Sequence, residues 1–176
     1  MAVGVAVVSV VVGHADSQSA PQCRHWHDQG VDFDTRPASY AVIVRDEEVL
    51  LTHYRTPSAQ GWTLPGGGVE LHESPQECCR REVLEETGYH VEVGALVGVG
   101  HVWIPAATRE FPNGDRALLG LQIIYRAQIV SGELECEVDG STDDVRWVPL
   151  AQLDDYRGPG GWPVTAIRSA LASAAD

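Results

Sequence analysis

Alternating apolar and polar residues predict a series of β-strands on both sides of one central helix. Residues 39–45 form a β-branched run and residues 49–54 form a second one after a short acidic break, which together predict a hairpin. Residues 62–65 predict a short strand that leads directly into three consecutive glycines. Three more strands are expected after the helix, over residues 91–104, 117–130 and 145–148.

The central helix has clear boundaries in the sequence. Ser74 is a good N-cap residue, Pro75 suits the first helical position and Glu77 completes a capping box. Gly88 stands where a left-handed residue would end the helix. These signals predict a helix of three to four turns between Ser74 and Gly88.

The end of the chain predicts a second helix. Residues 164–174 are rich in alanine, and Ile167 and Leu171 are four residues apart, as on one face of an amphipathic helix. Strands both before and after the central helix favour an α/β (α+β) fold, in which helices pack on a mixed central sheet.

The length of 176 residues fits one domain with some spare chain at the ends. We assign residues 31–176 to that domain and residues 1–30 to an N-terminal extension, either poorly packed or adding a strand. The first thirteen residues are nearly all apolar but too few to cross a bilayer as a helix. A secretory signal is the alternative, although the first basic residue is Arg24.

The composition argues against some classes of partner. The formal net charge is −13, which opposes the backbone of nucleic acids, so we expect no nucleic-acid partner. The apolar stretch at the N-terminus is too short to span a bilayer, so we expect no membrane partner either. A small anionic ligand stays compatible with this charge, because local arginines and a bound cation act at short range.

The cysteines indicate reduced thiols. Cys78 and Cys79 are adjacent on the predicted helix, so their side chains point to different faces and are poorly placed to bond with each other. Reduced thiols are typical of the cytoplasm, and we therefore expect a cytoplasmic location. The sequence leaves the oligomeric state open, with a homodimer as one alternative.

Three glutamates on the central helix are the strongest candidates for chemistry. Glu82, Glu85 and Glu86 lie within about 100° of one helix face. Like charges at this spacing destabilise a helix and also oppose its dipole near the C-terminus. The arrangement becomes useful if a hard divalent cation takes oxygen ligands from the stripe. The alternative is a solvated acidic face.

Neighbouring residues favour the metal hypothesis. Arg81 lies one i,i+4 step from Glu85, so its guanidinium can orient a carboxylate. Glu73 lies just before the helix. The flexible backbone of residues 66–68, with Gly67 at its centre, can bring a carbonyl oxygen near the same cation.

Together these residues form the pattern G-x5-E-x7-R-E-U-x-E-E-x-G, in which U is aliphatic. Its fixed positions are Gly67, Glu73, Arg81, Glu82, Val83, Glu85, Glu86 and Gly88. The pattern resembles the signature of the Nudix hydrolase family, and the surrounding order of elements resembles the Nudix fold over about residues 38–155. Tyr89 stands where that signature expects an aliphatic residue, and His72 replaces a frequent glycine. The resemblance implies an α/β/α sandwich.

The resemblance also implies an activity, which is Mg²⁺-dependent hydrolysis of a nucleoside diphosphate linked to another group, with Mn²⁺ as a substitute. It assigns metal binding to Glu82, Glu85, Glu86 and the Gly67 carbonyl. The expected catalytic set consists of Glu82, Arg81 and Glu85. Within it Arg81 orients the catalytic carboxylate, and Glu73 has a supporting role. The general base stays open between Glu82 and a carboxylate within residues 137–144.

Residues outside the signature bear on the choice of substrate. Pro105 follows Tyr89 by 16 residues, an offset that resembles the ADP-ribose pyrophosphatase group. Arg109 and Arg116 in the following loop are candidates for contacting a ribose or phosphate, or are ordinary loop residues. We therefore expect ADP-ribose or a related nucleotide sugar. The alternatives are a housecleaning nucleoside triphosphate pyrophosphatase and a nucleotide-sensing domain without catalysis.

Overall fold

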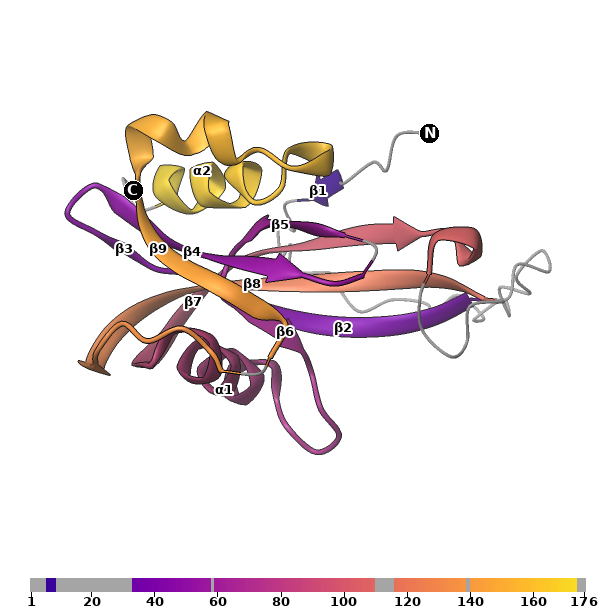
Figure 1. Cartoon of the computed structure of the whole chain (residues 1–176), viewed down its shortest axis with the longest axis horizontal. Helices are drawn as coiled ribbons and strands as arrows, with labels where there is room; N and C mark the ends of the chain where they lie inside the picture. Colours follow the sequence, from indigo (N-terminus) through magenta and orange to yellow (C-terminus); the bar gives the residue numbers. More distant parts are fainter. Residues whose placement is uncertain (1–5, 9–32, 58, 110–115, 139, 174–176) are drawn as a thin grey trace, which may run out of the picture.

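Two β-sheets lie between two α-helices in the structure, which is a computed structural model (Figure 1). It describes residues 6–8, 33–57, 59–109, 116–138 and 140–173. Most of the predicted N-terminal extension therefore lies outside the described residues, and the proposed division of the chain at residue 30 stays a prediction. No helix in these ranges is long and apolar enough to cross a membrane.

The larger sheet has five strands in the order β1-β7-β8-β2-β6. β2 and β8 run parallel, whereas the other neighbours are antiparallel, so the sheet is mixed as predicted. The strands are β1 (Ala6–Val8), β2 (Phe33–Val42), β6 (Gly66–Gly68), β7 (Tyr89–Ile104) and β8 (Ala117–Gly132).

The smaller sheet is built around β4 (Glu48–Arg55), which pairs antiparallel with β3 (Val44–Arg45), β5 (Gln60–Thr63) and β9 (Thr142–Pro149). The predicted hairpin is confirmed between β3 and β4. The run that we expected as its first strand is divided, because the chain passes from the larger sheet to the smaller one at Ile43. The mixed sheet layer thus consists of two sheets that are hydrogen-bonded separately.

The central helix α1 (Pro75–Thr87) has the predicted caps. The Ser74 hydroxyl accepts from the Glu77 backbone, and the Glu77 carboxylate accepts from the Ser74 backbone. Gly88 ends the helix in the left-handed conformation, with a φ of 72°. The predicted second helix is α2 (Val164–Ala172). In the described part of the chain, short 3-10 helices connect the elements, namely η1 (Ala106–Thr108), η2 (Leu150–Tyr156) and η3 (Pro159–Gly161).

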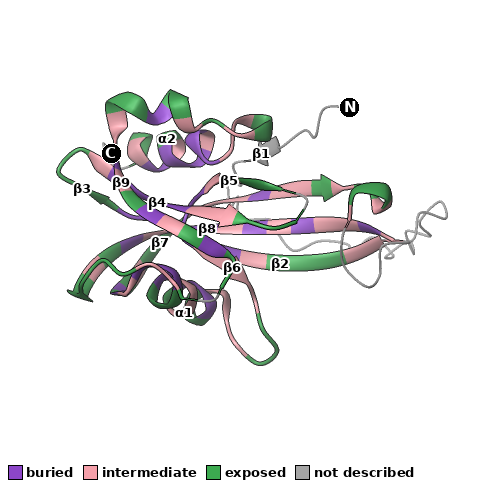
Figure 2. Cartoon of the chain, in the orientation of Figure 1, coloured by how far each residue is buried: buried purple, intermediate pink, exposed green. Residues whose placement is uncertain are grey.

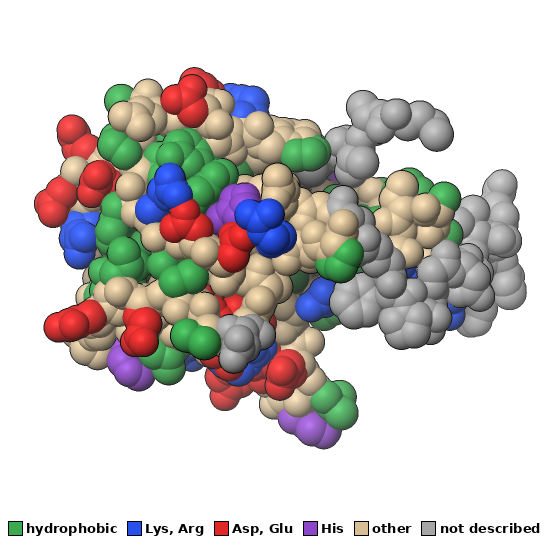
Figure 3. All heavy atoms as spheres, in the orientation of Figure 1, with side chains coloured by type: hydrophobic (Ala, Val, Ile, Leu, Met, Phe, Trp, Pro, Cys, Tyr) green, Lys and Arg blue, Asp and Glu red, His purple; other side chains and the backbone are tan. Residues whose placement is uncertain are grey.

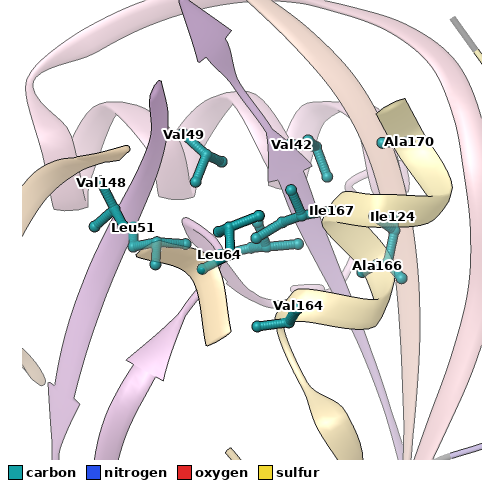
Figure 4. Close-up of a cluster of buried hydrophobic side chains, with 11 residues drawn as sticks. Val42, Val49, Leu51, Leu64, Ile124, Val148, Val164, Ala166, Ile167 and Ala170 are labelled. Atoms are coloured by element: carbon teal, nitrogen blue, oxygen red, sulfur yellow. The ribbon is translucent and has the colours of Figure 1, made fainter. Parts of the chain in front are cut away.

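The helices cover opposite faces of the strands, which gives the predicted α/β/α sandwich (Figures 1 and 2). Cys79 and Val83 of α1 pack in one core cluster with Tyr89, whose side chain is buried and so serves the packing role of an aliphatic residue. Ile167 of α2 packs in the other cluster with Leu51 and Leu64 (Figure 4). The first cluster fixes α1 against the strands that supply the candidate site, and the second fixes α2 on the other face.

Candidate active site

Glu82 and Glu86 of α1 face the glycine strand β6. A Cβ atom placed on Gly67 would lie 2.6 Å from the carboxylate of Glu82, so only glycine fits there without displacing that side chain. The backbone amide of Gly66 donates a hydrogen bond to Glu86 Oε2 at 2.9 Å. The helix and the glycine strand therefore approach each other as the acidic pattern predicts.

Glu86 is a buried carboxylate, with 7% of its surface exposed. The Thr142 hydroxyl donates to its Oε1 at 2.6 Å, and the Thr52 hydroxyl lies 3.5 Å from its Oε2. Its hydrogen-bond donors among the described residues, including the amide of Gly66, are all neutral. Burial raises the pKa of Glu86 to about 7. A divalent cation would supply the positive charge that this buried side chain lacks.

Arg81 links the three carboxylates around it. Its guanidinium donates to both oxygens of Glu73, at 2.7 and 3.2 Å, and to Glu82 at 3.0 Å and Glu85 at 3.1 Å. It also donates to the Gly68 carbonyl at 3.2 Å. The hydrogen bonds from Arg81 lower the pKa of Glu73 to about 2, and the same bonds raise the pKa of Arg81 above its ordinary value. The orienting geometry expected of Arg81 is present.

The three glutamates of the stripe differ in their surroundings. The side chain of Glu85 is 50% exposed and contacts Arg81, whereas that of Glu82 is 17% exposed, and burial raises the pKa of Glu82. Within the described ranges no three acidic, histidine or cysteine side chains already converge as a metal cluster. The donors nevertheless suit a hard divalent cation, since Glu82, Glu86 and the carbonyls of the glycine strand offer oxygen ligands only.

Three residues around the site were not found from the sequence. Thr52 and Thr142 lie 34 and 56 residues from Glu86 along the chain, and they reach it only because β4 and β9 pair in the smaller sheet. Arg36 on β2 lies against the glycine strand, since a Cβ atom on Gly68 would be 2.5 Å from its guanidinium. Its positive charge opposes the rise in the pKa of Glu82.

One carboxylate of the acidic stretch 137–144 lies near Glu86. Glu137 accepts a hydrogen bond from the Thr142 backbone amide at 3.3 Å, and its negative charge contributes to the raised pKa of Glu86. The geometry is therefore compatible with the expectation that this stretch contributes a base, which stays a prediction.

Arg109 and Arg116 lie apart from the glutamates. Both pair with Asp34 near the start of β2: Arg109 through Nη1, and Arg116 through Nε at 3.2 Å. Asp34 is four residues from the β2 position that pairs with Gly68, which corresponds to about 13 Å along a strand. Asp34 offsets one of their two positive charges. The role of Arg109 and Arg116 as substrate contacts stays a prediction.

The fold and the site define a class of protein: a layer of two β-sheets between helices, in which one helix presents carboxylates to a glycine strand. A model of the NUDIX domain matches residues 34–166. The chain belongs to this domain family.

Comparisons with individual proteins agree with the family and do not fix a substrate. The chain is 48% identical to a MutT-like protein of Streptomyces ambofaciens over a segment of 58 residues. This segment covers 33% of this chain and 37% of that protein. The chain is 31% identical over 101 residues to an ADP-ribose pyrophosphatase of Methanocaldococcus jannaschii, covering 56% and 53% respectively. The chain thus spans about a third to a half of these relatives.

A solved structure is similar over most of the chain. The NUDIX hydrolase from Nitrosomonas europaea superimposes with a TM-score of 0.64 at 26% identity, over 80% of this chain and 90% of that one. This similarity supports the α/β/α architecture with its mixed strands and flanking helices.

Proposed function

We propose that this protein is a Mg²⁺-dependent pyrophosphohydrolase that cleaves the diphosphate linkage of a nucleoside diphosphate derivative. The observation that carries the proposal is the environment of Glu86, a buried carboxylate surrounded by neutral donors beside the glycine strand. Holding a negative charge there without a cation is unfavourable, which is expected of a metal ligand in its metal-free state.

Glu82, Glu86 and the Gly67 carbonyl would hold the cation, and Glu85 would join them as a further ligand. A bound Mg²⁺ would supply positive charge to the diphosphate oxygens. Arg81 keeps Glu82 and Glu85 in place through hydrogen bonds near 3 Å, and Glu73 fixes the guanidinium from the other side. This chain of contacts supports preorganised ligands, which need little rearrangement when the cation binds.

Hydrolysis requires that a water oxygen attack one phosphorus while the bridging P–O bond on its other side breaks. The water proton would pass to a carboxylate, for which Glu82 and Glu137 are the candidates in the described part of the site. The leaving phosphate carries the electron pair of the broken bond as negative charge. Arg36, whose guanidinium lies against Gly68, would attract the diphosphate through its charge.

ADP-ribose or a related nucleotide sugar is the preferred substrate class. Support comes from the offset between Tyr89 and Pro105 and from the relative in Methanocaldococcus jannaschii that is named an ADP-ribose pyrophosphatase. Retention of every glutamate of the signature argues against a domain that only senses nucleotides.

The experiment is a screen of nucleoside diphosphate and triphosphate compounds with identification of products, in Mg²⁺ and in Mn²⁺. The proposal predicts AMP and ribose 5-phosphate from ADP-ribose, formed at least about 100-fold more slowly by Glu86→Gln. Monophosphate and pyrophosphate from triphosphates would instead identify a triphosphate pyrophosphatase. Binding of nucleotides without any hydrolysis would identify a sensor and overturn the proposed activity.

A further inference from the structure

Strand β9 contains an irregularity beside the candidate metal site. His53 on β4 pairs with Asp144, but the next residue, Tyr54, pairs with Thr142. Asp143 therefore has no partner across the ladder and is the extra residue of a β-bulge. Bulges occur frequently next to active sites, where they change the direction of a neighbouring side chain.

The bulge determines which way Thr142 points. Val145 faces the core on the α1 side, and Asp144 points to the opposite face, where it pairs with Arg146. In a regular strand Asp143 would point back toward α1 and Thr142 away from it. Because Asp143 is bulged, Thr142 is turned inward instead: its side chain is buried, and its hydroxyl donates to Glu86 Oε1.

Two side chains of β4, a histidine and an arginine, hold the bulged residue on the outer face. His53 Nδ1 lies 2.5 Å from Asp143 Oδ1, and Arg55 Nε contacts Asp143 Oδ2. Basic and acidic side chains and a histidine gather there over β4 and β9 (Figure 3). They line an open depression of about 390 Å³ that includes Trp62 and Arg146.

The sequence connects the two faces of the sheet at adjacent residues. Thr52, which contacts Glu86, precedes His53, and Thr142, which contacts Glu86, precedes Asp143. Among the described residues Thr142 is the donor to Oε1, whereas Gly66 and Thr52 lie on the Oε2 side. Thr142 thus holds one of the two oxygens of the Glu86 carboxylate, and the bulge turns Thr142 toward it.

We propose that His53, Arg55 and Asp143 are positioning residues for the candidate metal site, which act by fixing the bulge that turns Thr142 toward Glu86. The inference rests on the proposed role of Glu86 as a metal ligand. It assigns a function to a cluster of ion pairs on the face of the sheet that points away from α1.

The test measures the affinity of the protein for Mn²⁺ alone, from the electron paramagnetic resonance signal of the free ion. Asp143→Ala and Thr142→Val should each weaken binding about fivefold, the factor that corresponds to one hydrogen bond. Thr142→Ser keeps the hydroxyl and should stay within about twofold of the wild type. Asp154→Ala is the matched control, because Asp154 also contacts two nitrogen-bearing side chains, Arg157 and Arg168, but belongs to η2 and pairs with α2 instead of lying on β9.

The double variant Thr142→Val/Asp143→Ala separates positioning from a general structural effect. If Asp143 acts through Thr142, the double variant binds Mn²⁺ no more weakly than Thr142→Val. Additive losses, or Mn²⁺ binding by Asp143→Ala equal to that of the wild type, would overturn the inference. If Asp143→Ala does not fold, Arg55→Gln at an exposed position takes its place. It should also weaken Mn²⁺ binding, and it should add no further loss when combined with Thr142→Val. Unchanged Mn²⁺ binding in Glu86→Gln would instead refute the metal site itself.

Discussion

The hydroxyl of Thr142 lies 2.6 Å from the carboxylate of Glu86, and 56 residues of sequence separate the two. The same carboxylate accepts a hydrogen bond from Gly66 in the larger sheet, while Thr142 belongs to the smaller one. Glu86 therefore joins α1 to both sheets at one point. A buried acidic group is costly at such a junction, and binding of a divalent cation would offset that cost.

Replacing Glu86 with glutamine should lower kcat at least about 100-fold, because the variant loses a negatively charged ligand. The fold should be retained, since repulsion on the acidic stripe decreases. Steady-state hydrolysis and circular dichroism measure the two effects. Glu92→Gln on the exposed side of β7 is the control and should keep full activity. Similar turnover in both variants would contradict the metal role.

The stability of the metal-free protein should depend on the pH through Glu86. Its folded pKa of about 7 lies above the ordinary value of 4.5. The contribution of Glu86 to the free energy of unfolding is therefore complete below about pH 4.5, and it is lost as the pH rises through about 7. Glutamine does not titrate, so Glu86→Gln does not lose stability in this way. Its free energy of unfolding should therefore rise relative to that of the wild type between pH 5 and pH 7. Urea unfolding in the presence of a chelator measures the difference in free energy of unfolding between the two proteins. A difference that stays constant between pH 5 and pH 7 would contradict the raised pKa of Glu86.

Gly67→Ala should impair activity more than stability. The added Cβ atom would lie 2.6 Å from the Glu82 carboxylate, which must then move away from the glycine strand. We expect kcat/KM to fall about tenfold or more, as for a misplaced catalytic group. Gly98→Ala on β7 is the matched control, because nothing lies within 4 Å of its added Cβ. Equal activity of the two variants would show that Glu82 does not need its present position.

Arg81→Lys should reduce turnover although the charge is kept. A lysine cannot donate simultaneously to both oxygens of Glu73 and to Glu82 and Glu85, as the guanidinium does. A loss of about tenfold to 100-fold in kcat is expected from the loosened carboxylates. Arg80→Lys, at the exposed neighbouring position, should behave like the wild type. An active Arg81→Lys variant would show that charge alone suffices.

Arg36→Gln should raise KM for the diphosphate substrate about tenfold and leave kcat within about threefold, because Arg36 is expected to bind the ground state and the transition state alike. Arg168→Gln, which alters an exposed arginine paired with Asp154, serves as the control. A change in kcat alone would place Arg36 in the chemical step instead of in binding.

Local features were predicted well from the sequence. The limits of α1 follow from Ser74, Glu77 and Gly88, whose hydrogen bonds and backbone angles involve only nearby residues. The contact of Arg81 with Glu85 is equally local, because residues four apart on a helix are neighbours.

Contacts between distant segments could not be predicted in the same way. Thr52 and Thr142 meet Glu86 through strand pairing, and the bulge at Asp143 breaks the alternation that a sequence pattern would assume. At Ile43 the chain passes from one sheet to the other, and the sequence there contains no residue typical of a turn. The pairing of Arg109 with Asp34 is another such contact, since 75 residues separate the two along the chain, and the role of Arg109 toward a substrate stays a prediction.

The most direct test is a crystal structure of the protein with Mn²⁺ and a non-hydrolysable ADP-ribose analogue, with the ion located by its anomalous scattering. The account predicts one or more peaks within coordination distance, about 2.0 to 2.5 Å, of Glu82 and Glu86 oxygens, with the diphosphate of the analogue beside them. Ions and diphosphate bound away from these two carboxylates, with Glu86 still surrounded only by neutral donors, would contradict it.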